Sequence, residues 1–313
     1  MIVLLETVHP DALALLSSID DVVLVAEPPE LDAAHVGPGV RALVTRGLGR
    51  VTAETFSQLP ELAVVGRCGA GLDNIDTAAA AAAGIAVVHA PGVTAGAVAE
   101  HALMLMLALA RRLGELDRAV KTGYWAIRSG YEGVEMRGKR LGVVGLGAIG
   151  TRVAELGMAL GMDVVATTRR KQIGDVVRLP LDELLATSDV VQLCVPLTAE
   201  TSRLIDGARL KALKPGAMIV NTARGPIVDH GALAAALAAG TLGGYAADVW
   251  DPEPPEVGDN SLLDPRTLVT PHVAALTDVT YREICVRTAD AVAAVLTGRK
   301  PDPRSVFVMP PPS

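Results

Sequence analysis

The sequence has few aromatic residues and no block of basic residues. Phe, Trp and Tyr make up 3% of its 313 residues, and its formal net charge at pH 7 is -7. A nucleic-acid-binding surface usually combines clustered Lys and Arg with interleaved aromatic side chains, and neither pattern occurs here. The composition therefore argues against a nucleic-acid partner, and any anionic ligand must be held by local cations.

Long apolar segments are missing too. The alanine run at 78–83 and the segment 103–110 are too short or too weakly apolar to span a membrane, which takes about 20 residues. The apolar start, Met1 to Leu5, has neither a basic region nor a small-residue cleavage site, so it predicts a first strand rather than a signal peptide. We expect no membrane partner and a cytoplasmic location.

Cysteine is scarce. Cys68, Cys194 and Cys285 are odd in number, widely spaced and set in apolar contexts, which is typical of reduced thiols in a cytoplasmic protein. No C-x-x-C pair or histidine cluster accompanies them, so no metal site is expected.

The sequence does contain a regular alternation of short β-branched runs and helical stretches, which is typical of parallel sheets with crossover helices. Its length suggests about two domains. Two sets of strands are expected, one at 2–5, 22–25, 42–44, 63–67 and 86–88, the other at 141–144, 163–166, 190–194, 218–221, 244–248 and 268–270. Six strands are the number of a complete dinucleotide-binding fold. We therefore predict an α/β protein with two doubly wound parallel-sheet domains.

A glycine motif, Gly145-Leu146-Gly147-Ala148-Ile149-Gly150, lies between the expected strand 141–144 and an expected amphipathic helix at 151–160. In such a G-x-G-x-x-G turn the first glycine allows the tight turn, the second lets the backbone approach a pyrophosphate, and the third lets helix pack on strand. The helix N-terminus supplies N–H groups to the anion. The motif predicts a dinucleotide site.

The end of the next expected strand reads Thr168-Arg169-Arg170, where an acid that binds the ribose 2′-hydroxyl is usual. A hydroxyl and two guanidinium groups favour a 2′-phosphate instead, so NADP is the preferred cofactor and NAD a possible one. The alternative is that these arginines are solvated charges beside a helix.

Ligands of doubly wound sheets bind beyond the carboxyl ends of the strands. The loops that follow the expected strands 190–194 and 218–221 are therefore also expected to face the cofactor. Arg224 follows an expected buried strand and has small residues on both sides. Its planar guanidinium could bind a carboxylate through two hydrogen bonds. The alternative is an ion pair within the domain. The expected cofactor contacts on these loops are Val195, Pro196, Thr201, Thr222 and Ala223.

A candidate acid–base pair lies further on. Prolines flank Glu253, and His272 directly follows the last expected strand. A carboxylate bonded to one ring nitrogen stabilises imidazolium and fixes the tautomer, which leaves the other nitrogen to move a proton. The other histidines, His9, His35, His89, His101 and His230, are expected at surfaces or helix flanks without such a setting.

An expected helix from about Ala99 is apolar around its whole circumference at Leu103-Met104-Leu105-Met106-Leu107. Such a helix must be covered on every side. It is expected either at a subunit interface or buried within one subunit.

Seven motifs resemble, in order, those of the D-isomer-specific 2-hydroxyacid dehydrogenases, with most likeness to glyoxylate and hydroxypyruvate reductases. They are Cys68-Gly69-Ala70-Gly71-Leu72-Asp73-Asn74-Ile75-Asp76, the segment Pro91 to Glu100, the glycine motif, Val195-Pro196-Leu197-Thr198, Asn221-Thr222-Ala223-Arg224-Gly225, Asp248-Val249 through Glu253-Pro254, and Thr270-Pro271-His272.

The resemblance implies a Rossmann domain (99–283) inserted into a flavodoxin-like substrate domain (1–98 and 284–313), and a homodimer. It implies an NAD(P)-dependent dehydrogenase that moves a hydride between the cofactor and a small 2-oxo or D-2-hydroxy acid. Arg224, Glu253 and His272 would be catalytic, with His272 also near the cofactor. The backbone of Ala70 and Gly71 would bind the substrate carboxylate, and Asp248 the nicotinamide amide.

Two segments bear on specificity. Relatives often carry Asn where this chain has Gly92-Val93-Thr94, so Thr94 is the expected substitute near the nicotinamide. The segment Val44 to Arg50 resembles the first substrate loop, in which Arg46 could meet a substrate phosphate as in phosphoglycerate dehydrogenases. The Thr168-Arg169-Arg170 segment at the end of its strand, together with the lack of a regulatory extension, resembles glyoxylate and hydroxypyruvate reductases more. A small 2-oxo acid is therefore the preferred substrate.

Two other hypotheses on the function remain. A nicotinamide-sensing corepressor shares this fold without acting as an enzyme. Formate dehydrogenase relatives have Gln in place of Glu253, so the acid argues against them.

Overall fold

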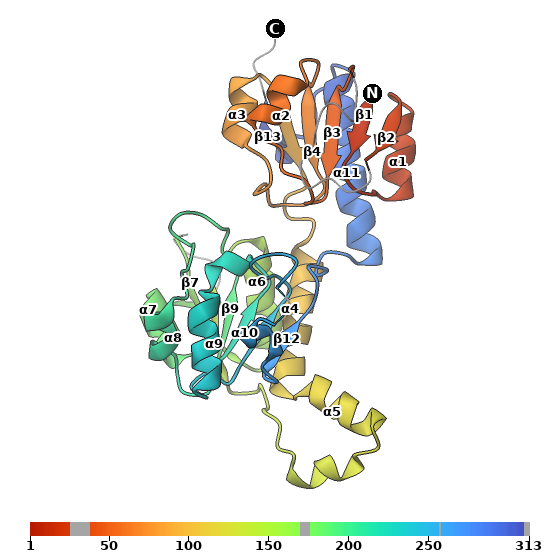
Figure 1. Ribbon diagram of the computed structural model, residues 1–313. Helices are drawn as coiled ribbons and strands as arrows, with labels where there is room; N and C mark the ends of the chain where they lie inside the picture. Colours follow the sequence, from red (N-terminus) through yellow and green to blue (C-terminus); the bar gives the residue numbers. More distant parts are fainter. Residues whose placement is uncertain (26–37, 170–175, 257, 310–313) are drawn as a thin grey trace. The chain divides into compact units, whose positions relative to one another are not determined.

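The structure, a computed structural model, describes residues 1–25, 38–169, 176–256 and 258–309, and the chain divides into two compact units (Figure 1). The first unit comprises Met1–Thr94 and Leu276–Ser313, and the second comprises Ala95–Ala275. The boundaries expected from the sequence, 98/99 and 283/284, would cut the helices α4 (Ala95–Ala110) and α11 (Asp278–Leu296), whereas the units divide ahead of both.

The first unit contains a six-stranded sheet in the order β13-β5-β4-β3-β1-β2. Its strands are parallel except β13, which pairs antiparallel with β5 at the edge. The sequence did not predict β13. The bounds are β1 Ile2–Leu4, β2 Val22–Leu24, β3 Ala42–Thr45, β4 Val64–Arg67, β5 Ala86–His89 and β13 Val306–Val308.

Helices cover both faces of this sheet. On one face α1 (Pro10–Ser17) and α11 bury Leu16 and Val292 against the strands, and on the other α2 (Ala53–Gln58) and α3 (Thr77–Ala82) contribute Phe56 and Ala80. Strands buried on both faces explain why the sequence shows continuous apolar runs rather than alternation.

The second unit contains a seven-stranded sheet in the order β12-β11-β10-β9-β6-β7-β8, with all pairs parallel. Six of its strands were expected; the seventh, β8, has only two residues and was missed. The bounds are β6 Arg140–Val144, β7 Asp163–Thr167, β8 Val177–Arg178, β9 Val190–Leu193, β10 Met218–Asn221, β11 Gly244–Ala247 and β12 Thr267–Val269.

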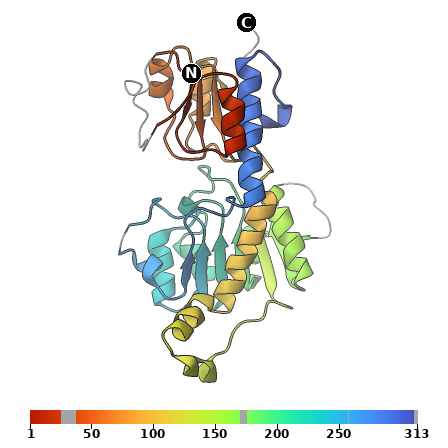
Figure 2. The same ribbon diagram turned by 90° about the vertical axis from the view of Figure 1, so that its right-hand side faces the viewer.

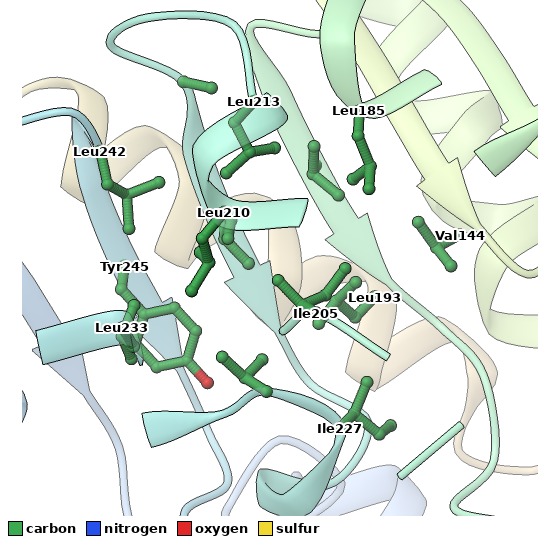
Figure 3. Close-up of a cluster of buried hydrophobic side chains, with 14 of the residues drawn as sticks. Val144, Leu185, Leu193, Ile205, Leu210, Leu213, Ile227, Leu233, Leu242 and Tyr245 are labelled. Carbon is green, nitrogen blue, oxygen red and sulfur yellow. The ribbon is translucent and has the colours of Figure 1, made fainter. Parts of the chain in front are cut away.

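The second sheet is also covered on both faces. One core cluster, which includes Tyr245 (Figure 3), joins the strands to α7 (Leu181–Thr187), α8 (Gly207–Ala212) and α9 (His230–Ala238). The other joins them to α4 and α6 (Ala148–Ala159). The short helices α5 (Leu113–Lys121), η2 (Trp125–Gly130), η3 (Gly225–Ile227) and α10 (Asn260–Leu263) complete this unit, and η4 (Pro303–Ser305) lies in the first.

The helix α4 is only partly covered within the chain. Leu105 and Met106 are buried, whereas Met104 is 47% and Leu107 36% exposed. Burial on every side within one subunit, one of the two expectations from the sequence, is therefore wrong. In Figures 1 and 2, α5 and the segment that follows it project from the body of the second unit. Among the described residues, no helix is long and apolar enough to cross a membrane.

Candidate active site

The order in which the chain adds strands to the second sheet reverses between β6 and β9. From β6 the chain runs outward to β7 and β8, then returns to β9 on the other side of β6 and continues to β12. Because all pairs are parallel, the carboxyl ends of these strands share one edge. Ligands of open α/β sheets bind beyond that edge at the point where the strand order reverses. The loops after β6 and β9 lie at this point.

The glycine turn joins β6 to α6 as the sequence predicted. Gly145 has φ +99°, a region that favours glycine, and a Cβ there would lie 2.7 Å from the carbonyl oxygen of Cys194. A Cβ on Gly150 would collide with the carbonyl oxygen of Gly145, so helix and turn can approach only without a side chain. Gly147, which precedes the helix beginning Ala148-Ile149, faces open space. These are the three requirements of a pyrophosphate turn.

The loop after β7 carries the basic residues of the motif. Thr168 is half-buried and Arg169 is exposed, while Arg170 lies outside the described residues. The pKa of Glu200 is lowered, chiefly by a hydrogen bond from the Thr198 hydroxyl and to a smaller extent by the charge of Arg169. Arg169 therefore acts electrostatically on the loop that follows β9.

The loop after β9 is fixed by its own hydrogen bonds. Thr201 donates its hydroxyl to the Pro196 carbonyl at 2.6 Å and accepts the Thr198 N–H at 2.7 Å. Thr201, expected as a cofactor contact, thus shapes the loop that presents Val195 and Pro196 beside the glycine turn.

The turn after β10 is held by Asn221, which was part of a motif but was not singled out from the sequence. Its amide donates to the Arg224 carbonyl at 2.9 Å and its side-chain oxygen accepts the Ala223 N–H at 3.0 Å. Thr222 is buried and its hydroxyl accepts a hydrogen bond from Gln192 at 3.0 Å. These contacts set the direction in which Arg224 leaves the sheet.

Asp248, at the end of β11, is 2% exposed and its carboxylate organises the loop after β12. It accepts the Thr270 hydroxyl at 2.5 Å and the N–H groups of Val273 and Ala274 at 2.9 and 2.8 Å. Its backbone carbonyl accepts the His272 N–H at 2.8 Å. The carboxylate that the resemblance assigns to the nicotinamide amide therefore also supports the loop of His272.

His101, on α4, belongs to the same network. Its Nε2 lies 2.8 Å from the Thr270 hydroxyl oxygen and 3.5 Å from Asp248. Since the Thr270 proton is given to Asp248, the imidazole donates to Thr270. The expectation that His101 lies at a surface or helix flank without such a setting is wrong. A histidine on an apolar helix gives no local sign of a partner 169 positions away.

His272 and Glu253 form the expected pair. The imidazole Nδ1 donates to the Glu253 carboxylate at 2.8 Å, and the other carboxylate oxygen accepts the Trp250 N–H at 3.1 Å. Burial alone would raise the pKa of Glu253. The net effect is a lowered pKa, because His272 contributes a hydrogen bond and a charge, Trp250 an N–H group and Arg224 a charge. The side chains of His272 and Glu253 remain 45% and 40% exposed, and Nδ1 is the imidazole nitrogen that bonds to Glu253.

The first unit carries the other expected contacts: Arg46, Ala70, Gly71 and Thr94. Arg46 follows β3 and forms an ion pair with Glu6, 3.4 Å away. Ala70 accepts a hydrogen bond from His89 at 2.9 Å, and Thr94 is buried. The sequence missed Arg67, at the end of β4, whose guanidinium lies against Gly69 and 3.7 Å from where a Cβ of Gly47 would be. It therefore joins the two loops that carry these contacts.

Within the described ranges, no group of three or more His, Cys, Asp or Glu side chains could hold a metal ion. The site in the second unit instead offers a hydrogen-bonded imidazole–carboxylate pair, a guanidinium and a glycine turn at one edge of one sheet. The glycine turn and the cations fit a dinucleotide: an open second glycine at a helix N-terminus suits the pyrophosphate.

Comparisons with known proteins agree with this geometry. Residues 103–274 match the family model of the D-isomer specific 2-hydroxyacid dehydrogenase, NAD binding domain. The glyoxylate reductase of Aeropyrum pernix is 38% identical over 309 residues, which cover 94% of this chain and 92% of that protein. The D-3-phosphoglycerate dehydrogenase of Archaeoglobus fulgidus is 45% identical over 247 residues, 77% of this chain but 46% of that protein. The chain thus spans about half the length of that relative.

Among solved structures, D-lactate dehydrogenase from Aquifex aeolicus, in complex with NAD and lactic acid, superposes with a TM-score of 0.89 at 28% identity, covering 100% of both chains. The second unit is accordingly a nicotinamide-cofactor domain of the Rossmann type. The chain belongs to the family of D-isomer specific 2-hydroxyacid dehydrogenases.

Proposed function

We propose that the protein is an NADPH-dependent reductase of small 2-oxo acids such as glyoxylate or hydroxypyruvate, forming the D-2-hydroxy acid. The hydrogen-bonded pair of His272 and Glu253, with Arg224 close enough to lower the pKa of Glu253, carries the proposal. The full-length similarity to the Aeropyrum pernix glyoxylate reductase supports it.

The reaction has four requirements: the carboxylate must be anchored, the carbonyl polarised, a hydride delivered to C2 and a proton delivered to oxygen. The bound nicotinamide supplies the hydride. Arg224 binds the carboxylate and polarises the carbonyl. His272, protonated and backed by Glu253, gives the proton from Nε2. In the oxidation direction the same nitrogen is the base.

The cofactor preference rests on the loop after β7. No carboxylate stands at Thr168 or Arg169 to accept a ribose 2′-hydroxyl, and an exposed guanidinium is present. A hydroxyl and a guanidinium can bind a 2′-phosphate directly, whereas an acid would repel it. The glycine turn, Val195, Pro196, Thr222, Ala223 and Asp248 would hold the rest of the cofactor.

A second candidate activity is oxidation of a phosphorylated hydroxy acid. The 45% identity to the Archaeoglobus fulgidus D-3-phosphoglycerate dehydrogenase and the cation Arg46 favour it. Steady-state kinetics with glyoxylate, hydroxypyruvate and 3-phosphohydroxypyruvate, each with NADPH and NADH, decide between the two. Turnover of none of these acids would instead favour a nicotinamide-sensing role.

We also propose a homodimer formed through α4, α5 and η2. Several exposed apolar side chains lie on or beside these consecutive helices, and gathered exposed apolar residues mark interaction sites. Sedimentation velocity of the purified chain distinguishes dimer from monomer. The exposed residues are Met104, Leu107, Leu113, Val120, Tyr124 and Trp125.

His272→Ala tests the acid–base role. We expect kcat to fall by about 10²-fold or more, the usual scale for positioned acid–base catalysis, with little change in the dissociation constant of NADPH. Stopped-flow reduction and a fluorescence titration of NADPH measure the two quantities. A variant with near-normal kcat would remove His272 from the mechanism.

Glu253→Gln tests the pair through the pH dependence of the rate. The lowered pKa of Glu253 keeps it ionised through the neutral range, where its charge stabilises imidazolium. Reduction needs imidazolium, and a neutral amide stabilises it less. The alkaline limb of the kcat profile for reduction should therefore move to lower pH. Glu256→Gln, an exposed acid of the same loop, is the control, and an unchanged profile in Glu253→Gln would contradict the pair.

Arg169→Ala tests cofactor choice. A charge-assisted hydrogen bond is worth roughly 1.5–3 kcal/mol, so KM for NADPH should rise about 10- to 100-fold while KM for NADH stays constant. Thr168→Asp should move the preference towards NADH. Arg140→Ala, which removes an arginine paired with Asp163 at the opposite end of the same strands, is the matched control. Higher wild-type kcat/KM with NADH would contradict the cofactor assignment.

A further inference from the structure

Glu6 lies two residues beyond the end of β1, in the loop beside the end of β3. The two strands are parallel neighbours, with Leu4 opposite Val44, so their carboxyl ends emerge together. The Glu6 side chain is 9% exposed. One carboxylate oxygen, Oε2, accepts the N–H groups of Arg46 and Leu48 at 2.7 and 2.8 Å and the Thr45 hydroxyl at 3.2 Å. This acid therefore holds the whole turn after β3.

The other oxygen, Oε1, lies 3.4 Å from the Arg46 guanidinium. On α11, the centre of the Tyr281 ring lies 5.4 Å from the guanidinium carbon of Arg46. The Arg46 side chain is 24% exposed and lies near both a carboxylate and an aromatic ring. Its charge is compensated before any ligand arrives.

This compensation bears on the charge of the substrate. A phosphate monoester carries close to two negative charges near neutral pH. If it approached Arg46 it would also approach the Glu6 carboxylate, and Glu6 cannot move away without releasing the two N–H groups of the turn. An uncharged end, such as hydrogen or hydroxymethyl, meets no such repulsion.

We propose that Glu6 is a positioning residue that sets substrate class: by neutralising Arg46 it favours 2-oxo acids with an uncharged distal group over their phosphorylated equivalents. This inference rests on the proposed function, because it takes the turn after β3 to face the distal end of the substrate.

The test compares hydroxypyruvate with 3-phosphohydroxypyruvate, which differ only by the phosphate. The readout is the ratio of kcat/KM for the phosphorylated acid to that for hydroxypyruvate, with NADPH. Glu6→Gln keeps the size of the side chain and an oxygen for the turn but removes the charge, so the ratio should rise about tenfold or more, the scale of one charge-assisted contact. Glu54→Gln, an exposed acid on α2, should leave the ratio unchanged.

Arg46→Gln separates a charge effect from a purely structural one. The single variant Arg46→Gln leaves the Glu6 charge uncompensated, so it should lower the ratio of kcat/KM for the phosphorylated acid to that for hydroxypyruvate. If Glu6 acts through Arg46, adding Glu6→Gln to Arg46→Gln should raise the ratio far less than it does in the wild type. A folded Glu6→Gln protein with an unchanged ratio overturns the inference, as does an equal rise in both backgrounds. Should Glu6→Gln fail to fold, an unchanged ratio in Arg46→Gln overturns it.

Calorimetric binding of the two acids keeps this test independent of hydride transfer. We expect the ratio of their dissociation constants to change with Glu6→Gln in the same direction as the kinetic ratio. If the wild type binds both acids but reduces neither, the proposed function fails while the binding ratio still decides the role of Glu6. A binding ratio that does not respond to Glu6→Gln overturns that role.

Discussion

The candidate active site depends on one buried charge, the carboxylate of Asp248. A carboxylate that is 2% exposed must be satisfied by hydrogen bonds, because an uncompensated buried charge is strongly destabilising. Its partners are the Thr270 hydroxyl and two N–H groups just beyond His272. Together with the bond from the His272 N–H to the Asp248 carbonyl, they hold His272 at φ +55°, which a non-glycine residue rarely adopts. The backbone at His272 is thus held by hydrogen bonds to Asp248.

His272 is held at both ends, and each end serves a different purpose. The backbone is fixed by Asp248, while the ring is oriented by Glu253, which is itself anchored by the Trp250 N–H. Trp250 in turn donates its indole N–H to Asp259 at 3.0 Å and packs against the His230 ring, 4.5 Å away. This support places a half-exposed pair on rigid neighbours, so that the imidazole can stay accessible without losing its orientation.

The sequence predicted most of the elements that depend on local pattern and missed side chains that depend on distant partners. Apolar runs located the strands of both sheets, and the glycine spacing located the turn between β6 and α6. The strand β8 has two exposed residues and was missed. The strand β13, an apolar run at Val306–Val308 that pairs antiparallel with β5, was also missed although its local pattern is that of a strand. His101 and Arg67 were missed because they depend on distant partners. Their partners, Thr270 for one and the turns at Gly47 and Gly69 for the other, come together only when parallel strands align their ends.

A carboxylate that accepts N–H groups of a neighbouring loop also occurs in the first unit, with a different consequence. Glu6, like Asp248, is an acid at a strand end that accepts N–H groups of the neighbouring loop, and both acids therefore fix loop geometry. The difference lies in the remaining partner. Asp248 lies near a histidine 3.5 Å away, whereas Glu6 pairs with a permanently charged guanidinium. In the sequence, Arg46 is simply a cation in a glycine-rich loop and suggests an anionic ligand. In the fold it is one half of an ion pair, so the net charge at this turn depends on Glu6 as much as on Arg46.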